Sequence, residues 1–239
     1  MLNDPELVAR EYEDESRLAA RRRAWREFLD GEDSDDRTFR AVAEGSPRSI
    51  LEVGCGWGEL AERMTRELPA EVVAFDPSAR MAELARGRGL RVFRADAQAI
   101  PLRDSSVDTV VANAVLYHVP DLDRGLSEIA RVLTEGGRLV ATVFDAGRFS
   151  ELFALVGRLP PEIPVTVDNA GELLARHFER VEARIGSHAL VFPSAAEVRA
   201  YLAATITMRD LAGSVEDFEG ELRTERTFGV FVAEVPRRR

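Results

Sequence analysis

Residues 49–60 read SILEVGCGWGEL, and this stretch decides the fold. Its first five residues form an apolar run that predicts a buried strand. Apolar residues then recur every four positions, as on one face of a helix: Leu60, Met64 and Leu68. Three glycines lie between the two patterns: Gly54, Gly56 and Gly58. Because glycine turns sharply and admits a ligand close to the backbone, the stretch predicts a strand, a ligand-binding loop and a helix.

The alternation of strand and helix continues from residue 48 to residue 144. Strands are expected at five places: 49–53, 71–75, 90–94, 107–113 and 138–144. Helical patterns are expected between them at 60–68, 78–87 and 122–133. This rhythm is typical of a parallel sheet covered by helices, so the predicted fold class is α/β.

The flanking segments follow less regular patterns. In the N-terminal part, helices are expected at 5–29 and 37–44, and the acidic residues between them, 32–36, at a solvated linker. Towards the C-terminus, strands are expected at 180–186, 188–193 and 227–235. Two capping boxes are expected to open helices, Asn169 with Glu172 and Ser194 with Glu197. We expect the segment 149–226 to be inserted into the same sheet.

Charge and composition narrow the possible partners. The chain has 239 residues and a formal net charge of −10, which disfavours contact with the phosphates of nucleic acid. All 32 basic residues are arginines, so lysine Schiff bases and P-loop lysines are excluded. Cys55 is the only cysteine, so we expect no disulfide, no metal centre and a reducing compartment. Without a visible signal peptide or apolar spanning run, we expect a cytoplasmic protein that binds no membrane.

Carboxylates that follow the glycine loop indicate which ligand the loop binds. A dinucleotide fingerprint would need glycine at position 59, where Glu59 instead opposes a pyrophosphate. Asp76 ends the second strand, where a carboxylate can accept both hydroxyls of a ribose, and Asp96 follows the third. Each alone is also explained as a cap or turn residue. Together, at successive strand ends, they predict an adenosine-type ligand.

The chain resembles the class I S-adenosylmethionine-dependent methyltransferases, in particular the small-molecule group of the ubiquinone and menaquinone methyltransferases. The matching motifs, between about residues 48 and 144, are LEVGCGWG, VVAFDPSARMAELAR, RADAQAIPL, DTVVANAVLYHVPDLD and EIARVLTEGGRLVATV. The resemblance implies a Rossmann-like, seven-stranded sheet, mostly parallel with the last strand antiparallel, flanked by helices. It also implies an N-terminal helical lid at 1–45 and a methyltransferase domain at 46–239, in which insertions within 149–226 shape the acceptor site.

The resemblance further implies which residues bind S-adenosylmethionine. Those around its methionine part would be Glu52, Gly54, Cys55, Gly56 and Gly58, with the backbone of Asn113 at the ammonium group. Those around the ribose and adenine would be Asp76, Pro77, Met81, Asp96 and Ala97.

A base is needed only when the acceptor carries a proton at the reacting atom. His118 is the candidate general base, because it follows the fourth strand and the ordinary pKa of histidine, ~6.5, suits proton removal. The alternative is that His118 only lines the pocket. Tyr117 is a second candidate, by stacking on cofactor or acceptor. Tyr12 and Trp25 either cover the cofactor or pack in the core, and two histidines are expected to be structural, His177 and His188.

These observations favour an enzyme that transfers a methyl group from S-adenosylmethionine to O, N or C of a small organic acceptor, including acceptors of specialised metabolism. Three alternatives stay open. Trp57 stands where the family often has Thr or Ser, and GCGWG also occurs in cyclopropane fatty-acid synthases, so a lipid acceptor is one. A nucleic-acid methyltransferase is another, although no Asn-Pro-Pro-Tyr string follows the fourth strand. A cofactor-binding scaffold or cyclase on the same fold is the third.

Overall fold

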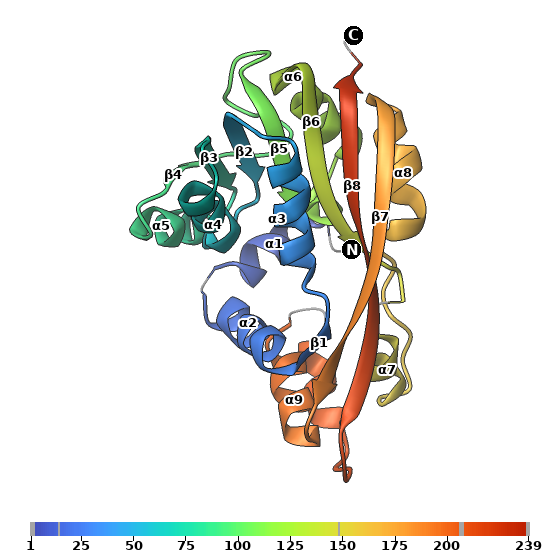
Figure 1. Ribbon diagram of the computed structural model, residues 1–239. Coiled ribbons are helices and arrows are strands. Elements are labelled where there is room, and N and C mark those ends of the chain that lie inside the picture. Colours follow the sequence, from blue (N-terminus) through green and yellow to red (C-terminus); the bar gives the residue numbers. More distant parts are fainter. Residues whose placement is uncertain (1–2, 14, 148, 206–207, 238–239) are drawn as a thin grey trace.

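The computed structural model describes residues 3–13, 15–147, 149–205 and 208–237, which fold around one mixed β-sheet (Figure 1). Within these residues the sheet has eight strands in the order β1-β7-β8-β6-β5-β2-β3-β4. The strands are β1 (Leu29–Gly31), β2 (Ser49–Val53), β3 (Glu71–Asp76), β4 (Arg91–Arg94), β5 (Val107–Asn113), β6 (Leu133–Phe144), β7 (Phe178–Phe192) and β8 (Leu222–Pro236).

The strands from β2 to β6 are parallel to one another, whereas β8 runs antiparallel to both β6 and β7. Strands β2 and β5 lie in the middle of the sheet and are buried along nearly their whole length, which suits the apolar runs at their centres. The predicted Rossmann-like α/β class, with an antiparallel last strand, is confirmed. In such a sheet, ligands bind in the crevice outside the carboxyl ends of the parallel strands.

Helices connect the strands and cover the sheet. They are α1 (Pro5–Glu11), α2 (Ser16–Phe28), α3 (Ser34–Glu44), α4 (Glu59–Glu67), α5 (Ala79–Gly87), α6 (Leu122–Val132), α7 (Ser150–Ala154), α8 (Val167–Ala175) and α9 (Ala195–Ala203), with 3-10 turns η1 (Leu116–His118) and η2 (Arg209–Ser214). Helix α3 packs on β5, β6 and β8, and α8 packs on β6, β7 and β8. In Figure 1, α3 crosses in front of the central strands.

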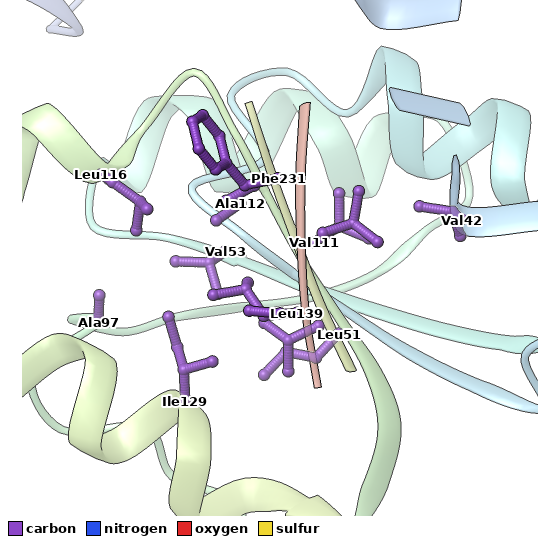
Figure 2. Packing of buried hydrophobic residues seen from close by; sticks show 14 of the residues in the cluster. Val42, Leu51, Val53, Ala97, Val111, Ala112, Leu116, Ile129, Leu139 and Phe231 are labelled. Atoms are coloured by element: carbon purple, nitrogen blue, oxygen red, sulfur yellow. The ribbon is translucent and has the colours of Figure 1, made fainter. Parts of the chain in front are cut away.

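The main hydrophobic core lies along the central strands (Figure 2). Leu51, Val111 and Leu139, from three adjacent strands, have no exposed surface. Truncating a side chain buried in this way to alanine typically costs ~2 to 5 kcal/mol. The core therefore fixes the positions of the strand ends that carry the candidate site.

A second, smaller cluster lies where β7 and β8 extend beyond the other strands, next to α2, α7 and α9 (Figure 1). We call it the outer cluster; its buried members are Ala24, Phe149, Leu152, Phe153, Leu190, Phe192, Ala195, Val198, Tyr201, Leu202, Met208 and Val215. The helix α2 belongs to the N-terminal part of the chain, yet it packs here against C-terminal elements. The segment 149–226 contributes β7 and the beginning of β8 to the sheet.

Several element boundaries differ from the expectations. The sheet has one strand more than the predicted seven, because Leu29–Gly31 pairs with the edge of β7. The predicted helix at 5–29 is two helices, separated between Glu11 and Ser16. The strands predicted at 180–186 and 188–193 are one strand, β7, because its pairing with β8 continues through both.

The prediction that Asn169 is the N-cap of a capping box is wrong. Thr166 is the N-cap of α8, and the Thr166 backbone N–H donates to Oδ1 of Asn169 at 2.8 Å, so that Asn169 is the third helical residue. At α9, the Ser194 hydroxyl accepts from the backbone N–H of Glu197 at 3.4 Å, as expected of an N-cap. Among the described residues, no helix is both long enough and apolar enough to cross a membrane.

Candidate functional site

A cavity of about 310 Å³ lies at the carboxyl ends of β2, β3 and β5 and is walled on its other sides by α1, α2 and the outer cluster. One side, which we call the glycine half, is lined by Glu52, Gly54, Cys55, Gly56, Asp76, Pro77 and Asn113. The other side, the aromatic half, is lined by Trp25, Phe144, Phe149, Phe153, Tyr201, Met208 and Arg226. Pockets of this size and mixed lining are typical of small-molecule sites.

The backbone of the glycine loop is turned by positive φ angles at Gly54 (65°), Gly56 (54°) and Gly58 (87°). A Cβ atom on Gly54 would lie 2.4 Å from Val115, and one on Gly58 would lie 2.5 Å from Leu90. On Gly56 it would meet only Leu18, at 3.8 Å. The outer two glycines therefore permit close packing, whereas Gly56 leaves space on the cavity side.

Asp76 holds the glycine loop against the end of β3. The backbone N–H of Gly56 donates to its Oδ2 at 2.9 Å, and the N–H of Ser78 donates to its Oδ1 at 2.8 Å. Burial raises the pKa of Asp76, and these two hydrogen bonds partly oppose the rise. Each carboxylate oxygen has two acceptor positions, so Asp76 can accept further hydrogen bonds from a ligand's hydroxyl groups.

Glu52 lies below the loop with 3% of its surface exposed. Burial raises its pKa to about 8; the charges of Asp35 and Asp76 add to this effect, and Arg22 opposes it. Its Oε2 has no hydrogen-bond partner among the described residues. A buried acceptor without a partner is costly, so a donor or positive charge arriving in the glycine half would be stabilised here.

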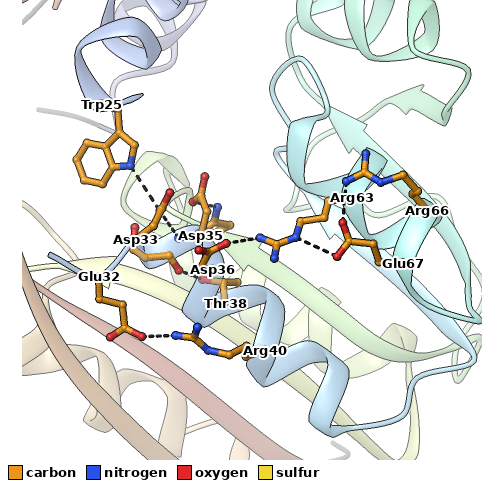
Figure 3. A network of polar contacts seen from close by, with 12 residues as sticks. Trp25, Glu32, Asp33, Asp35, Asp36, Thr38, Arg40, Arg63, Arg66 and Glu67 are labelled. Carbon is orange, nitrogen blue, oxygen red and sulfur yellow. Dashed lines mark hydrogen bonds and ion pairs between the residues drawn. The ribbon is translucent and has the colours of Figure 1, made fainter. Parts of the chain in front are cut away.

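The acidic residues 32–36 are not the solvated linker that the sequence predicts (Figure 3). Asp33 caps α3 by accepting from the N–H of Asp35 at 2.8 Å, and Trp25 Nε1 donates to Asp33 at 3.5 Å. Asp36 forms an ion pair with Arg63 on α4. The segment therefore ties α2, α3 and α4 together at the edge of the cavity.

Asp35 reaches into the cavity wall. Its Oδ1 accepts from Asn113 Nδ2 at 2.8 Å and its Oδ2 from Arg22 at 2.7 Å. Burial acts to raise the pKa of Asp35, but the charge of Arg22 and these hydrogen bonds outweigh it and lower the pKa. Arg22 also pairs with Glu59 at 3.2 Å. Since the Asn113 side chain donates within this network, its backbone remains the group predicted to meet a ligand.

The two candidate catalytic residues lie together beside the glycine half. Tyr117 and His118 both line the cavity, with ring centroids 4.5 Å apart. The Tyr12 hydroxyl is 3.4 Å from His118 Nε2, and either atom can donate, depending on the imidazole tautomer. Burial raises the pKa of Tyr12, so this phenol stays protonated at neutral pH.

Four of the predicted cofactor residues do not line the cavity. Gly58 packs on α5, where its Cβ would lie 3.0 Å from Ala85, and Met81 is fully buried within the same helix. Ala97 is buried beside the cavity-lining residues but is not one of them, and Asp96 is exposed. The Asp96 carboxylate accepts from the backbone and side chain of Gln98. Contact between these four residues and a ligand stays a prediction.

Cys55 and the other two histidines are buried. Burial and the charges of Glu52 and Asp76 raise the pKa of Cys55, which makes its thiol a poor nucleophile. His177 Nε2 lies 2.8 Å from Asp123, and His188 Nδ1 lies 3.0 Å from the carbonyl of Glu32. These partners fit the structural roles expected of both histidines.

Among the residues of the aromatic half, the prediction from sequence named only Trp25 and missed the others. Its other residues lie at the end of β6, in or next to α7, in α9, just before η2 and in β8, and none stands in a recognisable motif. One signal was present at Arg226. This arginine alternates in phase with buried residues of β8, namely Thr224, Phe228 and Val230. Because alternate residues of a strand point to the same face, an arginine in phase with buried residues is expected to be buried itself.

The segment that carries the glycine half matches a known protein family. Residues 51–141 match the family described as a methyltransferase domain. A malonyl-(acyl-carrier protein) O-methyltransferase of Geobacter sulfurreducens is 40% identical over 119 residues, 47% of this chain and 45% of that protein. Demethylmenaquinone methyltransferase of Deinococcus radiodurans is 36% identical over 135 residues, 50% of this chain and 56% of that protein. The chain thus spans about half the length of the curated relatives that it matches.

Solved structures match over more of the chain. A putative methyltransferase of Bacillus halodurans has a TM-score of 0.61 at 17% identity, covering 85% of this chain and 99% of that one. An S-adenosylmethionine-dependent methyltransferase of Thermotoga maritima has a TM-score of 0.54 at 21% identity, covering 84% and 89%. These likenesses show the fold. Residues 51–141 thus resemble a methyltransferase domain, on a fold shared with solved methyltransferase structures.

Proposed function

We propose that this protein transfers a methyl group from S-adenosylmethionine to a small organic acceptor. The observation that carries the proposal is the glycine half of the cavity, which is lined by an open backbone at Gly56 and by two buried acidic side chains, Glu52 and Asp76. Relatives that match about half of this chain include a malonyl-(acyl-carrier protein) O-methyltransferase, a demethylmenaquinone methyltransferase and the methyltransferase GfsG of Streptomyces halstedii.

The residues present fit this cofactor. Asp76 retains acceptor positions for two ribose hydroxyls, and Gly56 leaves room beside the loop. The partnerless Oε2 of Glu52 offers a hydrogen-bonding position to a ligand in the glycine half. When bound, S-adenosylmethionine supplies a methyl group activated by a sulfonium. The protein's role is to hold acceptor and cofactor together in a cavity that excludes water. Such positioning alone can lower the reaction barrier by several kcal/mol, within the ~7 to 11 kcal/mol of well-oriented reactions.

His118 is proposed as the residue that removes a proton when the acceptor is an alcohol, phenol or acid. It lines the cavity, and Tyr12 lies against its Nε2. An acceptor hydroxyl that takes the place of the Tyr12 hydroxyl would be within reach of the imidazole. Tyr117 is proposed to pack against cofactor or acceptor. The N-terminal helices α1 and α2 contribute Tyr12 and Trp25 to the wall and are proposed to act as a lid.

Cofactor binding is tested by calorimetric titration of S-adenosylhomocysteine into the wild type, Asp76→Asn and Asp104→Asn. Asp104 is exposed and pairs with Arg131, away from the cavity, so its variant is the control. Loss of charged hydrogen bonds in Asp76→Asn is expected to weaken binding about tenfold or more. Absence of binding to the wild type would contradict the proposal, and so would equal affinities of all three proteins.

Methyl transfer itself is tested with trideuteromethyl-labelled S-adenosylmethionine and a pool of small metabolites. A labelled product supports transfer to a small acceptor, and His118→Gln then reports on the base. The same fold is found in the cyclase SpnF, with a TM-score of 0.56 at 20% identity. A product that is isomerised but unlabelled would favour cyclase chemistry over the proposal. We propose that the enzyme acts in the cytoplasm, which fits a single buried cysteine.

A further inference from the structure

Strand β7 has an open edge over part of its length. Strand β1 pairs with residues 188–190 of β7 and ends there. Among the described residues, no strand pairs with 179–185 on the side away from β8, where β7 forms the margin of the sheet (Figure 1). We call residues 179–185 the free edge. Its register with β8 is continuous and it contains no proline, so it lacks two of the features that protect sheet edges.

Hydrogen bonds at Thr227 show which backbone groups of the free edge face outward. In a strand, the N–H and C=O of one residue point to the same side, and successive residues alternate. The Thr227 carbonyl accepts from the N–H of Asp145 at 3.0 Å, and its N–H donates to Asp145 Oδ1 at 3.0 Å, so odd-numbered residues of β8 face β6. Even-numbered residues of β8 face β7, where Val230 lies opposite Arg184. The residues of β7 that turn their N–H and C=O outward are therefore Glu179, Val181, Ala183 and Ile185.

The side chains of the free edge divide between the two faces of the sheet. Val181, Ala183 and Ile185 share one face, and Ile185 is 51% exposed. Glu182 and Arg184 lie on the other face, where they pair at 2.7 Å. The free edge therefore carries an apolar row on one side and charges of both signs on the other.

Both rows are complementary to themselves when a second copy of the chain runs antiparallel to the first about Ala183. In this register, Val181 of each copy faces Ile185 of the other. Glu182 of each copy likewise faces Arg184 of the other. Apolar pairs and pairs of opposite charge at directly opposed positions both stabilise a sheet.

The backbone supports the same register. Because Ala183 faces outward, two copies centred on it would exchange hydrogen bonds directly, and the outward groups of Val181 would meet those of Ile185. The Ile185 carbonyl already accepts from Arg37 at 2.7 Å, but a carbonyl oxygen has a second acceptor position. A centre at Glu182 would instead place this residue opposite its own copy, and like charges oppose such a pairing.

We propose that two copies of this protein associate through their free edges, antiparallel and centred on Ala183, and form one continuous sheet. The occupant is a second copy because the free edge is complementary to itself in charge and in apolar side chains. Arg184 also pairs with Glu44 of its own chain, and its five N–H donors leave one for Glu182 of the second copy. None of the described residues that line the cavity belongs to the free edge, so the association leaves that lining unchanged.

The test measures the mass of the full chain in solution by sedimentation velocity. Contact along one short strand is at the small end of interface sizes, so we expect a dissociation constant of about 1 to 100 µM. The wild type should shift from monomer to dimer as its concentration rises from about 1 to 200 µM. A wild type that stays monomeric over this range overturns the proposal.

Two charge reversals test the register. Glu182→Arg places arginines opposite each other at both ion pairs, and Arg184→Glu does the same with glutamates, so each variant alone should dimerise about tenfold more weakly. Mixed together, the two variants restore opposite charges at both pairs. We therefore expect the mixture to form a heterodimer with about the affinity of the wild type, measured by native mass spectrometry. An effect of Glu182→Arg alone, or a mixture that does not associate, overturns the register centred on Ala183.

A matched pair of reversals on the opposite side of the sheet is the control. Glu71→Arg and Arg91→Glu make the same changes of charge at two exposed residues of β3 and β4, and should dimerise like the wild type. Weakening by these variants equal to that at the free edge would overturn the proposal, because net charge would then explain it.

The backbone is tested by Ala183→Pro. Proline removes an outward N–H that β8 does not use, which edge strands tolerate, and is expected to abolish the dimer. Circular dichroism checks that each variant is folded. Should Ala183→Pro not fold, the charge reversals still decide, since they alter side chains on the surface. A folded Ala183→Pro that dimerises like the wild type overturns the proposal.

Discussion

The two halves of the cavity are built in different ways. The glycine half consists of a backbone loop and side chains at strand ends, and all of its residues lie within 51–141, the segment that matches the methyltransferase family. The aromatic half lies wholly outside this segment and draws on α2, the end of β6, α7, α9 and β8. The glycine half is thus set by local geometry, whereas the aromatic half is set by the packing of distant segments.

The largest effect is expected at Glu52, whose pKa is raised from an ordinary 4.5 to about 8 in the folded protein. Above pH 4.5 the unfolded chain releases this proton while the folded protein retains it, so the wild type loses stability until the pH passes 8. At pH 9, Glu52→Gln should therefore unfold with a free energy higher by about 3 to 5 kcal/mol. At pH 4 the difference should vanish.

The measurement is urea unfolding of the ligand-free protein across this pH range. Glu62→Gln, on the exposed side of α4, is the control and should show no pH-dependent difference. If Glu52→Gln and the wild type stayed parallel from pH 4 to pH 9, the carboxyl group of Glu52 would not be protonated in the folded protein.

The next effect concerns backbone geometry in the glycine half. Gly54→Ala combines a positive φ with a Cβ placed 2.4 Å from Val115, whereas Gly136→Ala has a positive φ and open space around it. We expect a loss of about 1 to 2 kcal/mol at Gly136 and about 2 to 4 kcal/mol at Gly54. Guanidinium unfolding of both variants measures the difference. Equal losses would show that Val115 gives way and that the loop is not tightly packed.

A third prediction separates the two halves. Leu202, with 1% of its surface exposed, belongs to the outer cluster behind the aromatic half. Leu202→Ala is expected to lower the free energy of unfolding by about 2 to 3 kcal/mol while leaving the affinity for S-adenosylhomocysteine within about twofold. Leu159→Ala, at an 88% exposed side chain, is the matched control for stability. A parallel loss of cofactor affinity in Leu202→Ala would mean that the halves are coupled.

The smallest effect is expected at the contact between Tyr12 and His118, beside the glycine half. Tyr12→Phe removes the hydroxyl that lies 3.4 Å from His118 Nε2 and keeps the ring. We expect kcat/KM for methyl transfer to fall about two- to tenfold, as for one neutral hydrogen bond. The loss should be larger for His118→Gln if His118 removes the proton. A pH profile of kcat/KM for both variants tests this order, and the reverse order would assign the proton transfer to Tyr12.

Much of the fold, and part of the site, could be predicted from sequence because the signals are local. Val107–Asn113 is a strand with the predicted bounds, since its apolar run is buried in the middle of the sheet. The glycine spacing and the position of Asp76 at a strand end likewise predicted residues that now line one cavity. These features depend only on neighbours along the chain.

The remainder depends on contacts between distant segments. Strand β1 has three residues and pairs with residues 188–190, so no local pattern announces it. Asp35 was assigned to a solvated linker because acidic runs are usually exposed, yet Arg22 and Asn113 hold it in the cavity wall. Arg226 becomes part of the site only once β8, α2 and the end of β6 meet.

The position of β8 also bears on how the protein is made. It lies between β6 and β7 in the sheet but follows both in the chain. Until residues 222–236 have left the ribosome, the inner edges of β6 and β7 have no partner. A nascent chain of this topology therefore exposes unpaired edges late in synthesis, and an interruption before β8 would release an aggregation-prone sheet.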